Sequence, residues 1–293
     1  MKKLFLVILL CISFGVAHSQ IKIMIETEKN EREKIDAFMS SGYSNIVVTR
    51  IDTDESDGSQ DSSKAMSIVV DKDNNTYTEI NYSPQFSKTV IKLDNNILSR
   101  EIFNDKDQIA GKTLYFYNDI GRLAKRELYF GDLKAFDEIY EYNGRKLTKM
   151  KYVMTDGTLV SYSLFVFDKS DNLLKETKYN SEDQVDYVYE YSYGKKSRLT
   201  EEKITFGSDN VTITTYSYGS DGNLKEKLTT AKGKQTSFIK YSYKDNNLTE
   251  EIYDTPEMKT TKTYTYNNGL LSRIKVTDQV EKSTYELVYE YVK

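Results

Sequence analysis

The residues of this chain that could hold a metal ion lie in an acidic, serine-rich run between positions 52 and 64. Asp52, Asp54 and Asp57 precede Gly58, and carboxylate oxygens at alternating positions before a glycine are typical of a calcium-binding loop. The step from Asp54 to Asp57 is one residue too long, and no glutamate occupies the twelfth loop position. We therefore expect a solvated acidic loop with no metal site, although the sequence leaves open whether these aspartates bind calcium.

Paired carboxylates are the second kind of residue that could do chemistry, as the general acid and base of a hydrolase. They occur at Glu201-Glu202 and at Glu250-Glu251. Neighbours along a β-strand point to opposite faces of the sheet, so neither pair forms a ready catalytic couple. We expect these glutamates to be charged residues of a solvent-exposed face, and we predict no catalytic residue and no cofactor.

The N-terminus predicts export. Lys2 and Lys3 precede an apolar stretch from Leu4 to Val16, and the small residues around His18 suit a cleavage that leaves Gln20 first. A lipid anchor at Cys11 is disfavoured, because a leucine precedes it where a lipoprotein signal needs a small residue. We expect a signal peptide over residues 1–19 and a secreted, periplasmic or cell-surface protein.

Cleavage at that site would remove the only histidine, His18, and the only cysteine, Cys11. The mature chain would then have no disulfide, no His or Cys ligand for zinc, and no Ser-His or Cys-His pair. Chemistry by carboxylates alone, or by Lys and Tyr, would remain possible. The formal net charge of −4, with both signs interspersed, gives no basic stripe for nucleic acid.

The remaining sequence is dominated by a repeat of about 25 residues, and a period of this length indicates a repeat architecture. Each unit carries an aromatic-x-aromatic pair, then a turn, then a leucine. A second Asn/Asp/Gly-rich turn follows about half a unit later, so each unit predicts two antiparallel strands. The pairs are Tyr115/Tyr117, Tyr140/Tyr142, Phe165/Phe167, Tyr191/Tyr193, Tyr216/Tyr218, Tyr241/Tyr243, Tyr264/Tyr266 and Tyr289/Tyr291.

The two aromatic residues of each pair lie two positions apart, so both rings share one face of the sheet. The return strands begin with a leucine and continue as charged stretches, which predicts one aromatic face and one charged face. An aromatic face of this kind could stack on sugars, but an exposed face this large would aggregate. We therefore favour the interpretation that the rings form the hydrophobic core.

These observations predict an all-β protein, with tandem β-hairpin repeats in one coiled antiparallel sheet. About 18 strands cannot stay flat, and we expect an open sheet or part-barrel with its aromatic face inward. A short helix from Glu26 to Ser41 is expected to cover one end of that face. The predicted divisions are residues 1–19 (signal), 20–65 (helix and acidic loop) and 66–293 (repeats).

The segment Tyr115-Phe116-Tyr117-Asn118-Asp119-Ile120-Gly121-Arg122-Leu123 resembles the YD repeat of bacterial Rhs proteins and teneurins. The resemblance extends loosely over residues 90–293. It implies β-hairpin repeats in a spiralling shell, which in that family encloses a cargo domain and in some members is linked to carbohydrate binding or cell contact. The chain has few repeats and no following cargo domain, so only the strand-pair architecture is expected to carry over.

The leading hypothesis is an exported, non-enzymatic binding or scaffold protein. Its partner would be an envelope polysaccharide or another exported protein that contacts the turns or the charged face, and it would be peripheral to a membrane at most. One alternative is a glycan hydrolase that uses carboxylates alone. Another is a lipid or lipoprotein carrier with a half-open barrel, which an open, dry cavity of ~300 Å³ or more would favour. A membrane-spanning barrel is disfavoured because the return strands are strongly charged.

Overall fold

The computed structural model describes residues 32–33, 35–53, 58–82, 85–94, 96–207 and 210–293. The predicted signal peptide and the first residues of the predicted helix lie outside these ranges. Within them the protein is all-β, apart from a helix over 32–33 and 35–41 and a single 3-10 turn, η1 (Lys195–Ser197). No helix in these ranges is both long and apolar enough to cross a membrane. The strands are β1 (Asn45–Thr53), β2 (Gln60–Asp71), β3 (Thr76–Asn81), β4 (Ser87–Asp94), β5 (Asn96–Phe103), β6 (Ile109–Tyr117), β7 (Leu123–Phe130), β8 (Leu133–Asn143), β9 (Lys146–Met154), β10 (Leu159–Phe167), β11 (Leu173–Asn180), β12 (Val185–Tyr193), β13 (Leu199–Phe206), β14 (Asn210–Tyr218), β15 (Leu224–Ala231), β16 (Lys234–Lys244), β17 (Asn247–Asp254), β18 (Lys259–Asn267), β19 (Leu270–Asp278) and β20 (Ser283–Val292).

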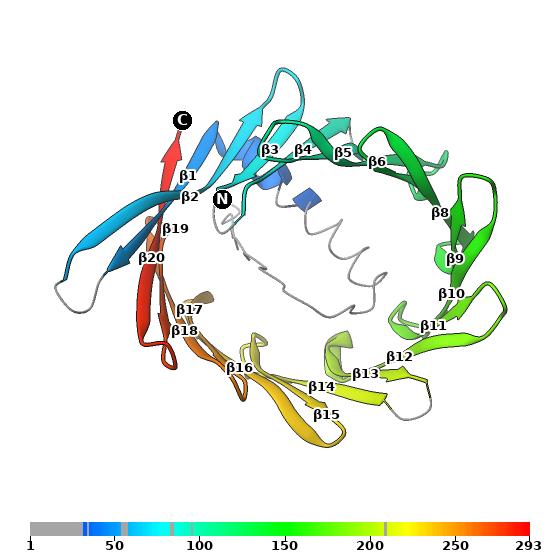
Figure 1. Ribbon diagram of the computed structural model, residues 1–293. Helices are drawn as coiled ribbons and strands as arrows, with labels where there is room; N and C mark the ends of the chain where they lie inside the picture. Colours follow the sequence, from blue (N-terminus) through cyan, green and yellow to red (C-terminus); the bar gives the residue numbers. More distant parts are fainter. Residues whose placement is uncertain (1–31, 34, 54–57, 83–84, 95, 208–209) are drawn as a thin grey trace.

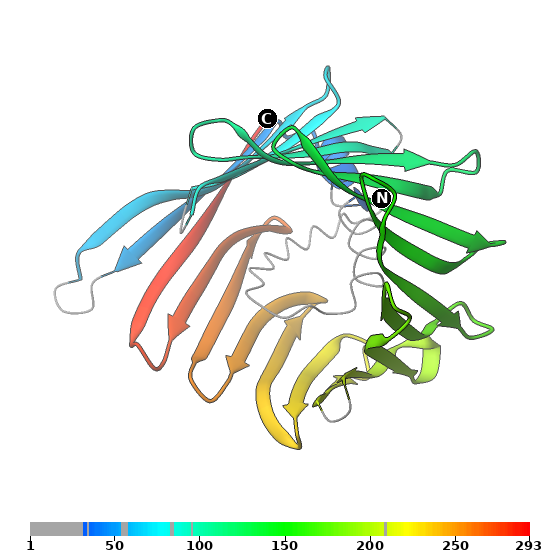
Figure 2. The same cartoon turned by 45° about the vertical axis from the view of Figure 1, so that its right-hand side comes forward.

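The sheet closes into a barrel, so the prediction of an open sheet or part-barrel was wrong (Figure 1, Figure 2). Every strand pairs antiparallel with its neighbours in sequence, and β1 pairs with both β2 and β20. In the closing pair Val48 lies opposite Tyr289. The strand that closes the ring precedes the repeats and does not carry their motif, and this is why the repeat pattern alone did not reveal closure.

The predicted acidic loop is also shorter than expected. Residues 60–64 belong to β2 and pair with Thr49–Thr53 of β1, where Thr53 lies opposite Gln60. Beyond the bulge between Val48 and Thr49, these halves of β1 and β2 form a hairpin that projects from the ring (Figure 1, Figure 2). Residues 49–52 of β1 also pair with β20, as far as Asp52 opposite Tyr285.

A β-bulge recurs at the same place in eight hairpins, from β4–β5 to β18–β19, and gives the sheet its curvature. The register shifts just before the second aromatic residue, and the extra residue is the one after the turn leucine. In four units this residue is Thr or Ser, and its hydroxyl donates to the carbonyl between the two aromatic residues at 3.0 or 3.1 Å. Bulges increase the local right-handed twist, so a bulge repeated around the sheet bends it into a ring.

The second tyrosine of a unit joins it to the unit before. Its hydroxyl donates to the backbone carbonyl of the first or second residue of the previous return strand, at 2.8–3.0 Å. The donors and acceptors are Tyr117 and Ile97, Tyr142 and Leu123, Tyr193 and Leu173, Tyr218 and Leu199, and Tyr291 and Leu271. We call this bond the tyrosine latch. Phe167 has no hydroxyl with which to form it.

The aromatic face lines the interior of the barrel, as predicted. Tyr115, Tyr140, Tyr189 and Tyr289 are buried there. The helix packs against the same wall, where the Phe38 ring lies 6.1 Å from that of Tyr77 (Figure 1). It ends where Gly42 adopts a φ of +81°, a left-handed conformation that favours glycine.

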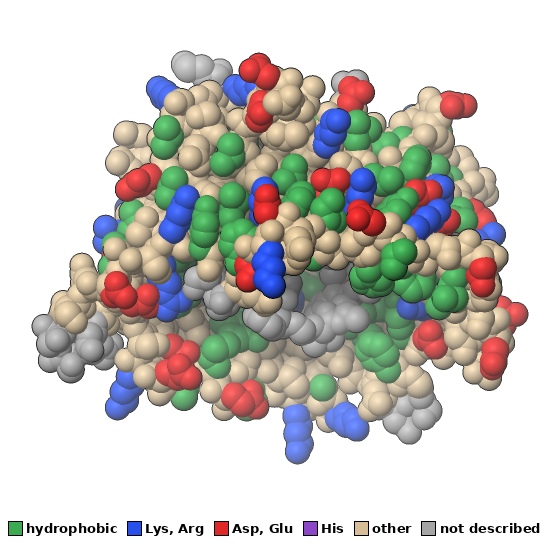
Figure 3. Space-filling view, turned by 45° about the horizontal axis from the view of Figure 1, so that its top comes forward, with side chains coloured by type: hydrophobic (Ala, Val, Ile, Leu, Met, Phe, Trp, Pro, Cys, Tyr) green, Lys and Arg blue, Asp and Glu red, His purple; other side chains and the backbone are tan. Residues whose placement is uncertain are grey.

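The outer wall carries ion pairs, such as Lys203 with Glu190 at 3.0 Å and Lys125 with Glu127 at 2.7 Å. On the face seen in Figure 3, Lys, Arg, Asp and Glu side chains are interspersed with hydrophobic ones. The inner wall is not purely apolar, since Glu138, Glu176 and Glu202 are buried on it. The division into an aromatic face and a charged face is therefore incomplete.

Candidate functional site

The predicted calcium ligands are only partly described. Asp52 is the penultimate residue of β1 and accepts hydrogen bonds from Arg50, at 2.8 Å from Nε and 2.6 Å from Nη2. These bonds hold the pKa of the Asp52 carboxyl below its usual value. Asp54 and Asp57 lie outside the described residues, so the calcium hypothesis stays a prediction. Within the described ranges, no three His, Cys, Asp or Glu residues are grouped so that they could hold a metal ion.

The paired glutamates separate onto the two faces of their strands. Glu202 is buried on the inner wall, opposite Thr214, whereas Glu201 lies on the outer wall. Glu251 accepts a hydrogen bond from Lys262 at 2.9 Å on the inner wall, and Glu250 faces outward. One member of each pair is thus an inner-wall residue, in place of the solvent-exposed position expected for both.

The tyrosine rings in the middle of the inner wall are packed as core. Tyr189, for example, has 1% of its surface exposed, and it lies 5.1 Å from Tyr187 in an edge-on contact. Burial raises the pKa of both hydroxyls. The Tyr189 ring therefore offers no free face on which a sugar could stack.

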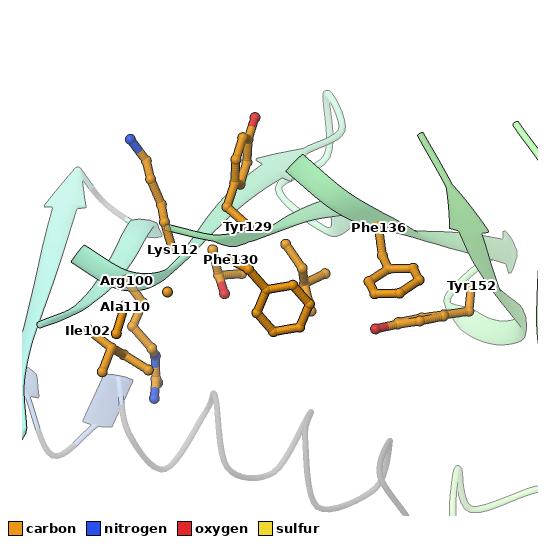
Figure 4. Close-up of a pocket in the computed structure, with 11 residues that line it drawn as sticks. Arg100, Ile102, Ala110, Lys112, Tyr129, Phe130, Phe136 and Tyr152 are labelled. Carbon is orange, nitrogen blue, oxygen red and sulfur yellow. The ribbon is translucent and has the colours of Figure 1, made fainter. Parts of the chain in front are cut away.

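A pocket of about 340 Å³ opens on the inner wall across β5 to β9. Figure 4 shows Arg100, Ile102, Phe130, Phe136 and Tyr152 on the interior side of the sheet, and the side chains of Lys112 and Tyr129 on the opposite side. The full lining is Arg100, Ile102, Ala110, Gly111, Lys112, Thr113, Leu128, Tyr129, Phe130, Phe136 and Tyr152. The sequence analysis did not identify this site.

The pocket exists because a glycine occupies an inward position of β6. Gly111 lies between Ile102 of β5 and Phe130 of β7 in the sheet register, and it places no side chain between them. A Cβ atom at Gly111 would meet only the Tyr129 carbonyl oxygen, at the ordinary contact distance of 3.6 Å. The backbone would therefore accept a side chain here.

The walls beside Gly111 are apolar and open to solvent. Phe130 and Ile102 keep 69% and 41% of their surfaces exposed, although both face the interior. They lie at the ends of their strands, next to the turn at Gly131 and the turn at Asn104–Gln108. Large exposed apolar side chains gathered in a hollow are typical of ligand sites.

An aromatic pair forms the far wall. The rings of Phe136 on β8 and Tyr152 on β9 stack with centroids 4.7 Å apart and planes inclined by 27°. Burial, with a smaller contribution from the charge of Glu138, raises the pKa of Tyr152. Glu138 itself accepts hydrogen bonds at 2.6 Å from the Arg126 Nε and from the Tyr140 hydroxyl.

Neither a known protein family nor a curated protein matches the sequence. Among solved structures, the chain is similar to TcdB2-TccC3 without its hypervariable C-terminal region and to the Photorhabdus luminescens Tc holotoxin pore. Each similarity has 14% identity and a TM-score of 0.35 over 81% of this chain, and the chain spans only 15% of the length of those chains. It is also similar to a porin-like protein from Bacteroides uniformis, with 12% identity and a TM-score of 0.34 over 85% of this chain and 96% of that one. Similarity at this level carries no argument about function.

Proposed function

We propose that this chain is an exported, non-enzymatic binding protein that holds a small, largely apolar molecule on the inner wall of its barrel. The observation that carries the proposal is the pocket around Gly111, with its exposed Phe130 and Ile102 and its stacked Phe136 and Tyr152. This is the carrier alternative from the sequence, with a closed barrel in place of a half-open one.

The size and lining of the pocket support a small apolar ligand. Binding sites for such molecules are concave, usually ~300–1,000 Å³ in volume, and lined by hydrophobic and aromatic side chains with few polar groups. The pocket, at about 340 Å³, lies at the small end of this range. A ligand that covers Phe130 and Ile102 would remove apolar surface from water, which stabilises the complex by roughly 25 cal/mol per Å² before the costs of binding.

Export is proposed from the N-terminal sequence, whose residues 1–19 have the pattern of a signal peptide. The ion-paired outer wall supports a barrel surrounded by water, because paired Lys and Glu side chains are costly against lipid. The protein would therefore act in the periplasm, at the cell surface or outside the cell.

The glycan-hydrolase alternative has less support. Its two carboxyl groups would have to meet the substrate in an open cleft. The inner-wall glutamates Glu176 and Glu202 have 0% and 5% of their surfaces exposed, and Glu138 is held by Arg126 and Tyr140. These carboxyl groups act as parts of the core.

The test is a binding titration with N-phenyl-1-naphthylamine, a neutral apolar dye whose fluorescence rises in apolar surroundings. The chain from Gln20 onward should bind it saturably at one site. Gly111→Leu would fill the hollow without a backbone clash, and we expect it to weaken binding at least about tenfold, or ~1.4 kcal/mol.

Thr215→Leu is the matched control, because it adds the same side chain to an exposed position of β14 on the outer wall. It should bind the dye like the parent chain. The proposal fails if the parent chain shows no saturable binding, or if Gly111→Leu binds as tightly as the parent.

A further inference from the structure

We infer that this pocket binds one unbranched hydrocarbon chain, which enters end-on from the end of the barrel and lies along β6 in a groove that Tyr115 closes. The ligand would be a molecule with a single linear chain of medium length and a polar end that stays at the mouth of the groove. This inference rests on the proposed function and names the shape of the molecule that the site would select.

Three inward positions of β6 set the shape of the groove. Gly111, nearest the end of the barrel, places no side chain there, and Thr113 places only a small one. The next inward residue is Tyr115, which is buried with 7% of its surface exposed. The inward side chains therefore grow larger from the end of the strand toward its middle, so that the hollow over β6 is open at Gly111 and closed at Tyr115.

The two neighbouring strands supply the walls of the groove. Ile102 of β5 and Phe130 of β7 lie on either side of Gly111, and Leu128 of β7 lies beside Thr113. Side chains stand roughly perpendicular to a sheet, so those of β5 and β7 rise on both sides of the low floor that β6 provides. The result is a groove one strand wide that runs along β6.

The width of the groove suits one hydrocarbon chain. Neighbouring strands lie about 4.8 Å apart, so β5 and β7 are separated by roughly 10 Å across β6. A chain whose carbon atoms contact both walls at ~4 Å needs about 8 Å. Two chains side by side, or one chain with an alkyl branch, would need about 4 Å more and would not fit unless a wall moved.

The depth of the groove limits the length of the chain. Gly111 and Tyr115 are separated by about 14 Å of extended strand, and a ~4 Å contact with the Tyr115 ring leaves about 10 Å. A hydrocarbon chain with bonds of about 1.5 Å and angles of about 111° advances ~1.25 Å per carbon. By this geometry the groove would accommodate about eight carbons.

The mouth of the groove is polar, which suits a chain that carries a polar end. The mouth lies beside the turn at Asn104–Gln108, where the Asn104 side chain accepts hydrogen bonds at 3.0 Å from the backbone N–H groups of Lys106 and Gln108. Lys106 and Gln108 are exposed to water. Burial of a polar group without a hydrogen bond costs free energy, so the polar end of the ligand would stay at this hydrated turn while the chain enters the groove.

The experiment measures how linear alcohols of increasing length displace the neutral dye N-phenyl-1-naphthylamine from the parent chain. Each methylene that enters the groove should tighten binding about threefold to fourfold. This gain should continue up to octan-1-ol and flatten for decan-1-ol and dodecan-1-ol, whose additional carbons would remain outside the groove. The branched isomer of octan-1-ol, 2-ethylhexan-1-ol, should bind at least about tenfold more weakly, because its branch leaves fewer carbons in the groove.

Thr113→Leu should close the inner part of the groove. A block two residues earlier removes about 7 Å of depth, so the gain should flatten about five carbons earlier, and hexan-1-ol and octan-1-ol should bind about equally. Thr215→Leu, the same substitution at an exposed position of β14, should behave like the parent chain. Leu128→Ala lowers the β7 wall and should reduce the preference for octan-1-ol over its branched isomer at least about threefold. Circular dichroism of each variant reports whether it is folded.

The outcomes separate this inference from the proposed function. If the dye does not bind the parent chain saturably, or binds Gly111→Leu as tightly, the proposed function fails and the inference fails with it. If the dye binds at the Gly111 site but no alcohol displaces it, the two isomers displace it equally, or affinity rises steadily up to dodecan-1-ol, only the groove is overturned. A gain that still continues up to octan-1-ol in folded Thr113→Leu would also overturn it. If Thr113→Leu does not fold, the comparison of the two isomers in the parent chain and in Leu128→Ala decides.

Discussion

The inner wall of the barrel differs sharply between β5–β9 and β10–β13, although both regions are built from the same repeat. In the first region the wall is hollowed around Gly111, and Phe130 stays largely exposed. In the second region it is closed: Ser163, Glu176 and Tyr189 have at most 1% of their surfaces exposed. The repeat therefore specifies the strands but not the openness of the wall.

Position along the strand explains the difference. Ser163 lies in the middle of β10, opposite the buried Met150 of β9, and its hydroxyl donates to Glu176 at 3.1 Å. A small side chain in the middle of a strand leaves space beside it, and longer side chains on either side along the strands fill that space. Gly111 lies near the start of β6, beside the ends of β5 and β7 and the turns that follow them.

The largest expected effect comes from truncating one aromatic ring in each region. Tyr189→Ala should lower the free energy of unfolding by about 3–5 kcal/mol, because it opens a cavity among fully buried neighbours. Phe136→Ala should cost less than half of that, since Phe136 is only half-buried and borders a hollow that water can reach. Urea-induced unfolding, followed by far-ultraviolet circular dichroism, measures both.

Equal losses in these two variants would break the comparison, because they would mean that the two walls are equally well packed. Val166→Ala, which truncates an exposed outer-wall residue of β10, serves as the control. Its effect should stay within about 0.5 kcal/mol, as is usual for surface substitutions.

The next effect tests what the two regions share. Tyr142→Phe lies in the hollowed region and Tyr193→Phe in the closed one, and each removes a tyrosine latch. Loss of one partly buried hydrogen bond costs about 1 kcal/mol. We expect the same loss in both variants, because both latches lie at the same end of their units. A loss confined to one region would show that the units are not equivalent at that end.

Phe167 offers the reverse change at an equivalent position. Phe167→Tyr should restore the missing latch to the carbonyl of Leu147 and raise the free energy of unfolding by up to about 1 kcal/mol. No gain, in a variant that folds normally, would contradict the view that the latch is a transferable part of the repeat.

The sequence predicted the parts of the fold that recur in every unit. The spacing of pairs such as Tyr140/Tyr142, and the turns between them, correctly indicated antiparallel hairpins whose rings face inward. Closure escaped prediction for two reasons. The bulges depend on a register that sequence spacing does not display, and the strand that completes the ring, β1, lies outside the repeats.

The pocket was not predicted because it results from the absence of a side chain at one position. Gly111 belongs to no motif, and it matters only because Ile102 and Phe130 stand on either side of it in the sheet. An inward position filled by glycine beside apolar strand ends was the signal available in the sequence. Recognising this signal would have required knowledge of how β5, β6 and β7 pair with one another.

A smaller effect concerns the bulges. Thr148→Val and Thr200→Val keep the shape of the side chain but remove the hydroxyl that donates to the carbonyl of Glu141 or Ser192. Each should cost about 0.5 kcal/mol, since one bond is partly buried and the other exposed. Ala124→Thr should give a gain of similar size at the bulge of β7, where the hydroxyl is naturally absent. Thermal unfolding of the three variants measures these shifts, and a loss larger than that of a latch variant would reverse the ranking.

The smallest effect concerns the outer wall behind the pocket. Glu127 of β7 accepts hydrogen bonds from Lys125 at 2.7 Å, Lys134 at 3.0 Å and Tyr129 at 2.9 Å, and these hold its pKa at about 2, against an ordinary value of 4.5. Because the pKa is lower in the folded state, the stabilisation is complete above pH 4.5 and is lost as the pH falls toward 2. Glu127→Gln should therefore flatten the decline in the free energy of unfolding across this window by about 0.2–0.4 kcal/mol, a value reduced by solvent screening. Glu290→Gln, at an exposed outer-wall position of β20, is the control and should leave the decline unchanged. If the free energy of unfolding of Glu127→Gln falls with pH as steeply as that of the parent chain, these ion pairs do not stabilise the outer wall behind the pocket.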